Sequence, residues 1–393
     1  MADDIFILGG ARTPMADYNG KLQAVSALEL GAIAARAALE RAGVPPGLVN
    51  HVVFGNVLQS SADAVYGARH VALKAGIPIE VPALTVNRLC GSGIQAAISG
   101  GQMIRLDEAA IVLTGGTESM SQAPHVIRGL RGGLRLGQGQ LEDTLWSALL
   151  DTYCGCTMAG TAENCAARYD VSREEQDRYA VRSQQLADAA WNAGRFADEV
   201  VPVEIKSRKG TELFAKDDHL RPGSTVEGLA QLSAAFSKNG CVTAGNASGI
   251  VDGGAALLLA SGAAVKAHRL EPLARLTHWA TVGVEPTLMG MGPVPATRMV
   301  LDRAGLTLAD IDLFEVNEAF AAQYLSVEKE LGLDRDRVNV NGGAIALGHP
   351  LGMTGTRLLL TLVLELRRRG LRRGIATACI GGGQGIAALV ESA

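Results

Sequence analysis

The chain has 393 residues, of which 48% are hydrophobic and 4% aromatic, and its formal net charge is −4. This length and apolar content support a large folded core and exclude a disordered chain. The slightly acidic balance argues against a general nucleic-acid binder, because such proteins carry a basic excess. Glycine is unusually abundant at 48 residues, so we expect tight turns and close backbone packing in a compact α/β enzyme.

The two ends of the sequence carry no recognisable targeting signal. The start, MADDIFILGGARTPM, places two acids before a short apolar strand, unlike a secretory signal or an Arg-rich transit peptide. The final VESA is no peroxisomal signal. No stretch approaches the roughly 18 consecutive apolar residues of a membrane span. We therefore expect a cytoplasmic protein without a membrane span.

The first long helix is predicted to begin at Ser26, where Ser-Ala-Leu-Glu forms a capping box, and to end near Gly43. The same pattern returns later in the chain. LERAGVPPGLVNHVVFGNV from Leu39 parallels LDRAGLTLADIDLFEVNEA from Leu301, whose helix ends at Gly305. In both segments the end of a helix leads into a strand.

Two further pairs of segments repeat in the same order. TVNRLCG from Thr85 parallels NVNGGAI from Asn339, and IVLTGGTES from Ile111 parallels ATACIGGGQ from Ala376. Each half interleaves strands with helices, the alternation expected for sheets covered by helices. The sequence therefore predicts a duplicated α/β fold.

The segment ALTVNRLCGSGIQAA, residues 83–97, ends an apolar run at a cysteine between glycines. Residues 84–86 read as a short strand, Gly91 and Gly93 permit a sharp turn, and apolar residues then recur at helical spacing. Cys90 thus lies at a strand-to-helix elbow, where helix amides favour a thiolate nucleophile and can hold an oxyanion. The alternative is a cysteine that is only packed in the core.

Residues 121–243 interrupt the repeat and read as an inserted domain. Cys154-Gly155-Cys156 could supply half of a metal site, but no second pair or histidine cluster follows, so we predict no metal site. Six cysteines without dense regular spacing indicate reduced thiols rather than a disulfide framework.

Other elements of the chain follow from local signals. A capping box at Ser172 opens a charged helix that is predicted to run to Asn192. The repeat resumes with TAGNASGIVDGGAALLLAS, whose apolar run over 255–260 predicts a buried strand. That strand should complete the first half of the fold.

Three further motifs should meet Cys90 at one pocket if the two halves pack as related units. NGGAIALGHPLG holds His349, ACIGGGQGIA holds Cys379 and Gly381, and EVNEAFA holds Asn317. Histidine can take a thiol proton near neutral pH, a second cysteine suggests a second proton transfer, and glycine amides can face an oxyanion. As alternatives, His349 could anchor a turn, Cys379 could be core packing, and Asn317 could cap a helix.

Together these motifs resemble the thiolase family over essentially the whole chain. The matching segments are VNRLCGSGIQA, TAGNASGIVDGGAA, VNEAFA, VNVNGGAIALGHPLG and CIGGGQGIA. The resemblance implies a thiolase-like duplicated α/β fold, in which two five-stranded sheets have helices between and outside them. It also implies a homodimer or homotetramer and acyl transfer with acyl-CoA and CoA as substrates, without a metal or other cofactor.

The resemblance divides the chain into an N-terminal half (1–120 and 244–268), an inserted loop domain for CoA and substrate (121–243), and a C-terminal half (269–393). It implies that a 3-ketoacyl-CoA and CoA are converted to acyl-CoA and acetyl-CoA through a cysteine thioester. The reverse Claisen condensation is implied as well.

The resemblance also assigns roles to the site residues. Cys90 would carry the acyl group, His349 would activate it, and Cys379 would exchange the proton on the α-carbon. The amides of Cys90 and Gly381 would form one oxyanion site. His349 and a water held by Asn317 would form the second.

Contacts to CoA are implied for Ser248, near the pantetheine arm, and for Arg221, near the nucleotide, although Arg221 could also be a solvated loop charge. Acetoacetyl-forming thiolases typically have His-Met where this chain has Thr157-Met158, which resembles thiolases of broader chain length. Met158 could provide an adaptable wall for the acyl chain, whereas a repacked loop would leave a short-chain acetoacetyl-CoA thiolase. Thr354 stands where a serine is more usual.

Two other functions remain open on the sequence. A 3-ketoacyl synthase shares the duplicated fold and a nucleophilic cysteine, but it generally completes its site with His-His or His-Asn, so Cys379 argues against it. An inactive thiolase-like acyl-CoA-binding or scaffold protein is disfavoured by the intact cysteine, histidine and cysteine at 90, 349 and 379.

Overall fold

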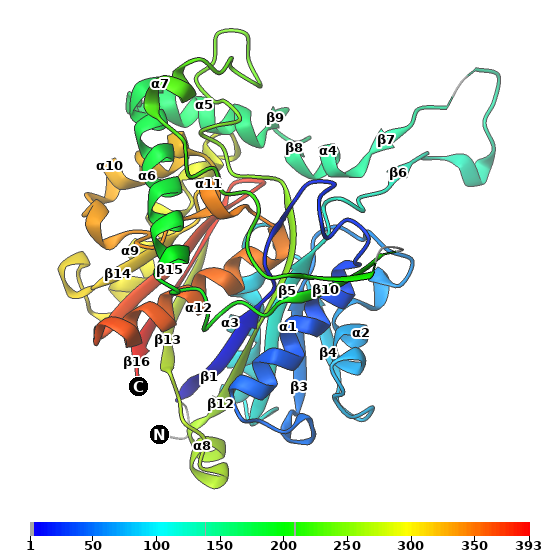
Figure 1. Ribbon diagram of the computed structural model, residues 1–393, viewed down its shortest axis with the longest axis vertical. Helices are drawn as coiled ribbons and strands as arrows, with labels where there is room; N and C mark the ends of the chain where they lie inside the picture. Colours follow the sequence, from blue (N-terminus) through cyan, green and yellow to red (C-terminus); the bar gives the residue numbers. More distant parts are fainter. Residues whose placement is uncertain (1–3, 138, 208–209) are drawn as a thin grey trace.

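The computed structural model describes residues 4–137, 139–207 and 210–393, and its largest element is a ten-stranded sheet. Its strands are β1 (Ile5–Arg12), β2 (Ala16–Asp17), β3 (His51–Gly55), β4 (Ala83–Val86), β5 (Ile111–Glu118), β12 (Val251–Ser261), β13 (Ala274–Gly283), β14 (Leu313–Val316), β15 (Arg373–Ile380) and β16 (Gln384–Ser392). They are hydrogen-bonded in the order β14-β15-β16-β13-β1-β12-β5-β3-β4, with β2 paired to β12 (Figure 1).

The two halves of this sheet repeat one strand arrangement. In the N-terminal half, β4, β3 and β5 are parallel neighbours, and β5, β12 and β1 follow in antiparallel pairs. In the C-terminal half, β14 and β15 are parallel, and β15, β16 and β13 are antiparallel. An isolated parallel bridge between Phe314 and Val338 takes the place that β4 has in the first half. The predicted duplicated α/β fold is confirmed.

The halves meet where β1 pairs with β13 through Phe6–Arg275 and Ile7–Ala274. The two five-stranded sheets that the resemblance implies are therefore joined edge to edge by one short antiparallel ladder. The apolar run predicted as a buried strand is β12, in which every residue is buried. It lies between β1 and β5, as expected for the strand that completes the first half.

The helices of the two halves are α1 (Ala27–Arg41), α2 (Gly67–Lys74), α3 (Ser92–Arg105), α8 (Gly262–His268), α9 (Pro293–Ala304), α10 (Ala321–Leu331), α11 (Ala344–Leu347) and α12 (Leu351–Arg369). The Ser26 side chain caps α1 by accepting from the Glu29 amide at 3.2 Å. Gly305 ends α9 with a φ of +64°, a conformation that glycine adopts without a Cβ clash. Both predicted boundaries are confirmed.

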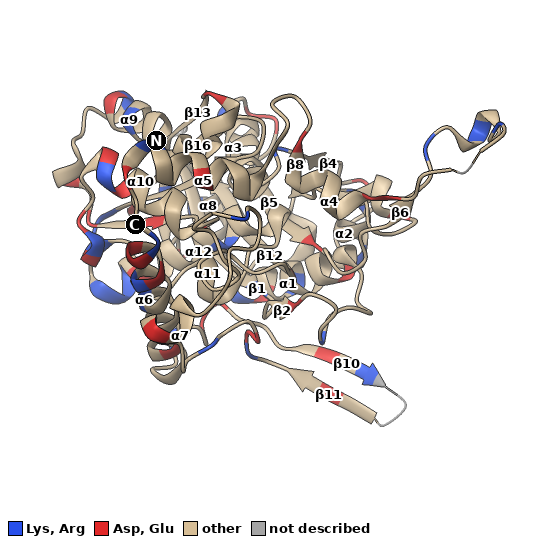
Figure 2. Cartoon of the chain, turned by 90° about the horizontal axis from the view of Figure 1, so that it is seen from above, with Lys and Arg blue, Asp and Glu red and all other residues tan. Residues whose placement is uncertain are grey.

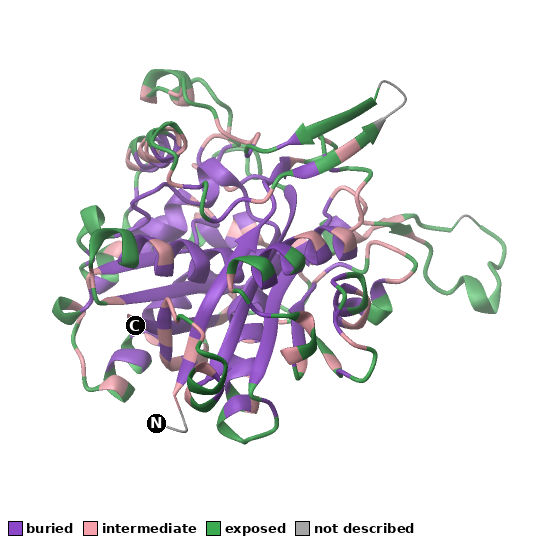
Figure 3. Ribbon diagram, turned by 60° about the horizontal axis from the view of Figure 1, so that its bottom comes forward, coloured by how far each residue is buried: buried purple, intermediate pink, exposed green. Residues whose placement is uncertain are grey.

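Helices α3 and α12 lie between the two halves, because each contacts strands of both, while α1 and α9 pack on β1 and β13 from outside. These two central helices approach each other through their backbones. A Cβ on Gly93 would lie 2.3 Å from the Thr356 amide nitrogen, and a Cβ on Gly355 would lie 2.4 Å from that of Ile94. The glycines thus place the first turns of α3 and α12 side by side in the buried interior (Figure 3).

The chain between β5 and β12 forms β6 (His125–Val126), β7 (Glu142–Asp143), α4 (Thr144–Leu149), β8 (Leu150–Asp151), β9 (Cys156–Thr157), α5 (Met158–Tyr169), α6 (Arg173–Asn192), β10 (Val203–Ser207), β11 (Gly210–Phe214) and α7 (Val226–Ala230). Helix α6 starts at the predicted Ser172 capping box and ends at Asn192. Figure 2 shows the arm around β6 and β7, and the β10–β11 hairpin, projecting from the body. Within the described part of the chain, no helix is both long and apolar enough to cross a membrane.

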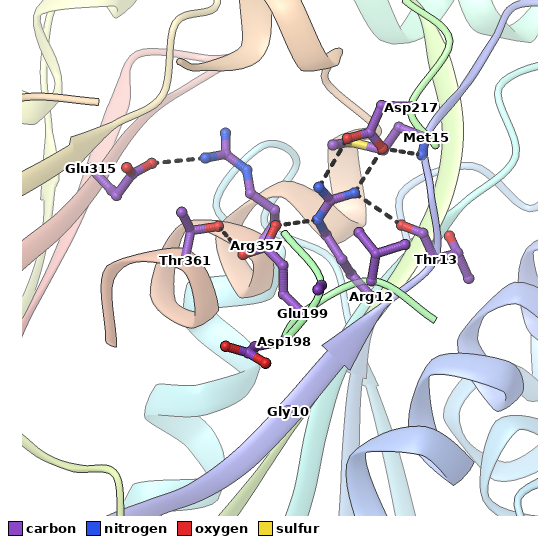
Figure 4. A network of polar contacts seen from close by, with 12 residues as sticks. Gly10, Arg12, Thr13, Met15, Asp198, Glu199, Asp217, Glu315, Arg357 and Thr361 are labelled. Atoms are coloured by element: carbon purple, nitrogen blue, oxygen red, sulfur yellow. Dashed lines mark hydrogen bonds and ion pairs between the residues drawn. The ribbon is translucent and has the colours of Figure 1, made fainter. Parts of the chain in front are cut away.

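A buried ion network ties this segment to both halves (Figure 4). The fully buried guanidinium of Arg12, on β1, donates to Glu199 at 2.6 Å and to both oxygens of Asp217 at 2.7 and 2.9 Å. Glu199 also accepts from Thr361 of α12 at 2.8 Å. Loss of one partner would leave a buried charge uncompensated, which typically costs about 3–5 kcal/mol. The network therefore fixes how the segment between β5 and β12 sits on α12.

Candidate active site

Cys90 lies at a tight elbow between β4 and α3, as predicted. Leu89 has a φ of +46°, a conformation that a leucine rarely adopts. Ser92 stabilises the elbow: its hydroxyl accepts from the Arg88 amide at 2.9 Å and donates to the Leu89 carbonyl at 2.7 Å. The thiol is thus held just before the first turn of α3, in a conformation over-determined by its neighbours.

Burial is the main reason that the pKa of the Cys90 thiol is raised to about 11; the charge of Glu118 adds to the rise, and the nearby backbone amides of Gly381 and Cys90 oppose it. The sequence predicted thiolate character from the helix start alone. Desolvation outweighs that effect, so the free thiol is protonated at neutral pH and needs a base.

His349 is buried, and its ring contacts Thr354 and Asn317. The Thr354 hydroxyl donates to the Pro350 carbonyl at 3.0 Å, so its single hydrogen is used, and its oxygen accepts from His349 Nδ1 at 2.6 Å. This arrangement leaves the lone pair on Nε2. Burial, aided by the charge of Arg357, lowers the pKa of His349 to about 3. The imidazole is therefore neutral and able to accept a proton.

Asn317 follows β14 and does not cap a helix, because α10 begins only at Ala321. Its Nδ2 lies 3.4 Å from Nε2 of His349, and its buried Oδ1 has no hydrogen-bond partner in the described part of the chain. An unpartnered buried carbonyl oxygen is an unusual and costly feature. It is suited to bind a polar group in the pocket beside His349.

Cys379 lies near the end of β15 and is fully buried. Burial raises the pKa of its thiol well above the ordinary value, and Cys90 adds to this shift. Gly382 and Gly383, both with φ of +79°, form the turn after it. They direct the Gly381 amide back toward Cys90.

Two buried carboxylates brace the site, and the sequence analysis did not identify them. Glu118 accepts from the amides of Leu58 at 3.0 Å and of Gly352, in the first turn of α12, at 2.9 Å. Burial raises the pKa of Glu118 to about 7. Glu318 accepts from Tyr179 at 2.7 Å and from the Ile345 amide of α11 at 3.1 Å. Acids at the ends of apolar strands, as in TGGTES and FEVNEAF, were the available signal.

The other residues predicted to bind CoA or the acyl chain differ in their burial and in their contacts. Met158 opens α5, and its sulfur lies 3.2 Å from where a Cβ on Gly381 would be. Thr157 caps the same helix by accepting from the Gly160 amide at 3.0 Å. Ser248 is half-buried, and its amide donates to Ala319. Met158 is thus the predicted residue that borders Gly381.

Arg221 is exposed, and its guanidinium pairs with Asp17 at 2.7 Å. The neighbouring His219 also contacts Asp17, and its ring lies against Gly249, whose carbonyl accepts from the His349 amide at 3.0 Å. Arg221 therefore lies at the surface, and the contacts through Asp17 and His219 connect it to the His349 loop. It remains available to solvent, as a group that binds a ligand anion must be.

Comparison with known proteins identifies the family. The model of the thiolase N-terminal domain matches residues 5–263, and that of the thiolase C-terminal domain matches residues 270–392. The chain belongs to the thiolase family. It is 53% identical to the protein named 3-ketoacyl-CoA thiolase, mitochondrial, of Homo sapiens, over 99% of this chain and 98% of that one. It is 49% identical to the acetyl-CoA acetyltransferase of Shinella zoogloeoides over the full length of both.

Solved structures match the fold of this thiolase along its whole length. Human mitochondrial 3-ketoacyl-CoA thiolase in complex with CoA superposes with a TM-score of 0.97 at 52% identity, covering 100% of this chain and 98% of that one. The fold and acyltransferase class inferred from the motifs are confirmed. Thiolases use CoA as a substrate, with no additional cofactor.

The prediction of a cytoplasmic location is wrong. The human relative is named mitochondrial, and so are four further relatives, from Pongo abelii, Bos taurus, Mus musculus and Rattus norvegicus. A compartment is set by a receptor that reads a targeting signal, and neither composition nor the folded core of a thiolase encodes it.

Proposed function

We propose that this thiolase cleaves 3-ketoacyl-CoA with CoA, and catalyses the reverse condensation, through a thioester on Cys90. The observation that supports this most directly is that the loops holding Cys90 and Gly381 pack against each other. A Cβ on Gly381 would lie 3.1 Å from Leu89 Cδ1, and a Cβ on Gly91 would lie 2.5 Å from Ile380 Cδ1. His349 supports the assignment, because its hydrogen bond to Thr354 through Nδ1 leaves the lone pair on Nε2, which can accept a proton.

In the proposed cleavage, His349 takes the proton of Cys90 while the sulfur attacks the ketone carbon of the substrate. The amides of Cys90 and Gly381 stabilise the tetrahedral oxyanion. The carbon–carbon bond then breaks, its electron pair passes into the thioester enolate, and Cys379 protonates the α-carbon to give acetyl-CoA. The thiol of a second CoA gives its proton to the Cys379 thiolate and attacks the acyl-Cys90 thioester. The tetrahedral intermediate releases acyl-CoA, and the Cys90 thiolate regains its proton from His349.

His349 and Asn317 are proposed to stabilise the enolate oxygen. Burial separately favours the neutral forms of the thiol and the imidazole. Proton transfer creates a thiolate–imidazolium pair whose mutual attraction offsets part of that penalty. The unpartnered Asn317 Oδ1 supports a bound water at this point, which would donate to the enolate oxygen.

Acylation of Cys90 can be tested directly. The enzyme is incubated with acetyl-CoA, digested in acid, and its cysteine-containing peptides are analysed by mass spectrometry. We expect one acetyl group on the Cys90 peptide and none after Cys90→Ser. An acetyl group confined to another cysteine of active enzyme would refute the assignment.

We further propose that the acyl site accepts chains longer than acetoacetyl. Around the Cys90 thiol, Leu58, Met120 and Leu145 form an apolar cluster, and Met158 and Met289 pack near Cys379. The 53% identical relative is named a 3-ketoacyl-CoA thiolase. A thiolysis series from four to about ten carbons, compared by kcat/KM, should rise or stay level, since each buried methylene contributes up to about 0.8 kcal/mol. A steep fall directly beyond four carbons would refute this.

Residues 121–243 are proposed to act as the loop domain that binds CoA, with Arg221 near the nucleotide and Ser248 near the pantetheine arm. The exposed rim position of Arg221 supports this role. Arg221→Ala should raise KM for CoA several-fold with little change in kcat. An unchanged KM would leave Arg221 as a solvated surface charge.

A homodimer or homotetramer is proposed for this chain. The arm that carries β6 and β7 extends away from the body and is largely exposed (Figure 3). It exposes the large apolar side chains Ile127, Leu130, Leu134, Leu136 and Leu141. Such side chains are costly to leave in water and are typical of interfaces. Light scattering that shows a monomer at micromolar concentration would refute the proposal.

A further inference from the structure

Cys154 and Cys156 form a pair of thiols that the proposed mechanism does not use. They lie at the turn between β8 and β9, two strands that pair Asp151 with Cys156. The turn is tight, because the Gly155 amide donates to the Asp151 carbonyl at 2.8 Å and Gly155 has a φ of +71°. Both cysteines are half-buried, and Tyr153 beside them is 89% exposed. A small reagent in solution can therefore reach this turn.

The two thiols are neighbours across Gly155. The Cys156 sulfur donates to the Cys154 carbonyl oxygen at 3.8 Å, and the Cys154 sulfur donates to the Asp151 carbonyl oxygen at 4.0 Å. Both are free. Over residues 4–137, 139–207 and 210–393, no group of three or more His, Cys, Asp or Glu side chains could hold a metal ion. The pair is thus an accessible dithiol.

We propose that Cys154 and Cys156 form a redox-modification site that a small-molecule disulfide oxidises reversibly to an intramolecular disulfide. One thiolate attacks a sulfur of the small disulfide, forms a mixed disulfide and releases one small thiol. The second thiolate then attacks the mixed disulfide and releases the other small thiol. The protein loses two protons and two electrons, and the small disulfide gains them as two thiols.

The position of the pair connects this modification to the acyl site. Cys156 directly precedes Thr157, whose side chain caps α5, and Met158, whose sulfur borders Gly381. Closing a ring across Gly155 constrains the turn and pulls on this cap. A displacement on the order of 1 Å near reacting groups can cost up to about 100-fold in rate. We therefore expect the oxidised enzyme to have a lower kcat/KM for thiolysis, a consequence that rests on the proposed function.

The site is tested by equilibrating the full-length enzyme in a series of reduced and oxidised glutathione mixtures. The samples are quenched in acid, free thiols are alkylated, and the peptide that contains both cysteines is analysed by mass spectrometry. As the mixture becomes more oxidising, this peptide should lose both alkyl groups and carry no glutathione. Dithiothreitol should restore both alkylation sites. A peptide that stays doubly alkylated, or that carries glutathione without closing the disulfide, would overturn the proposal.

Two single-cysteine variants distinguish closure of the intramolecular disulfide from oxidation of one thiol alone. Cys154→Ser and Cys156→Ser should each carry at most one glutathione, because no partner thiol remains to release it. This readout does not require turnover, so it stands even if the proposed acyl transfer fails.

Activity measured across the same glutathione series tests the link to the acyl site. In the parent enzyme, kcat/KM should fall roughly tenfold in step with disulfide formation, within the range that small displacements produce. The double variant Cys154→Ser/Cys156→Ser should keep its activity over that range. An equal loss in the double variant would assign the effect to Cys90 or Cys379 and overturn the link.

Discussion

The elbows that lead into α3 and α12 occupy equivalent places in the two halves, yet they carry different chemistry. In the N-terminal half, β4 ends at Val86, and α3 begins at Ser92, just after Cys90. In the C-terminal half, the bridge at Val338 is separated from α12 by the extra turn α11, and His349 directly precedes the helix entry. A duplicated backbone thus holds the proposed nucleophile on a short elbow and the proposed base on a longer one.

The two elbows are also held by different means. The short elbow holds itself through Ser92, which bonds to backbone groups on both sides of Leu89. The longer elbow depends on the buried carboxylate of Glu318, which accepts from α6 and from the Ile345 amide. A longer loop has more conformations to lose, so it needs additional bonds to be equally rigid. The base is therefore the more dependent of the two groups on distant parts of the chain.

The largest effect on kcat is expected when His349, the proposed base, is replaced. His349→Ala should lower kcat by roughly 10³-fold, within the range typical of a lost general base. Cys90 would keep its proton, because its pKa is raised to about 11. Steady-state thiolysis measures this effect, and circular dichroism controls for folding. A loss below tenfold would show that His349 is not the base.

Replacing the second thiol should separate two chemical steps. Cys379→Ser should lower full turnover by about 10²-fold, because a serine hydroxyl is a far weaker acid for transfer to the α-carbon. Acylation of Cys90 by acetyl-CoA should continue in this variant. Burst acylation and full turnover are measured on the same sample. Near-normal turnover would remove Cys379 from the mechanism.

The alkylation rate of Cys90 should depend steeply on pH, and the two buried thiols should differ in rate. A thiol with pKa near 11 is almost fully protonated at neutrality, so Cys90 alkylation by iodoacetamide should accelerate about tenfold per pH unit between about pH 7 and pH 9. Cys379, which is fully buried, should react more slowly throughout. Peptide mass spectrometry resolves the two sites. A plateau for Cys90 near pH 7 would contradict the raised pKa.

The smallest effect is expected at Thr354, which orients the base without contacting substrate. Thr354→Val removes the acceptor for His349 Nδ1 and should reduce kcat by about 3–10-fold, the usual worth of one hydrogen bond. Thr354→Ser should restore activity, because the hydroxyl is kept. The pH profile of kcat should shift in the valine variant only. Equal activity in both variants would show that the tautomer is set elsewhere.

Much of the fold was predictable because its signals are local. The cap at Ser26, the capping box at Ser172, the helix end at Gly305 and the apolar run of β12 each depend on neighbouring residues. At Ser26 only the serine side chain caps the helix, because the Glu29 carboxylate contacts Arg36 and Lys74 instead of completing a box. The repeat of these signals in one order then predicted the duplicated sheet. The join between β1 and β13 was not predictable, because it depends on how two edges separated by more than 250 residues meet.

The site was predictable only in part. Cys90, His349 and Cys379 were identifiable as reactive groups in glycine-rich loops, and Asn317 was identifiable as a polar group after an apolar strand. The bracing roles of Glu118 and Glu318 were not, because each carboxylate accepts from amides of segments far away in the sequence. The function of Thr354 also needed the structure, since its hydroxyl has to be seen between Pro350 and His349.

The sequence by itself determined which groups could react and where helices and strands begin and end, because side-chain chemistry, capping and glycine conformations are properties of short segments. The tertiary structure decided how those groups behave. Burial raises the pKa of Cys90 against the effect of the helix start, and burial beside Arg357 keeps His349 neutral. Desolvation depends on all the atoms that surround a group, and those surroundings form only when the chain folds.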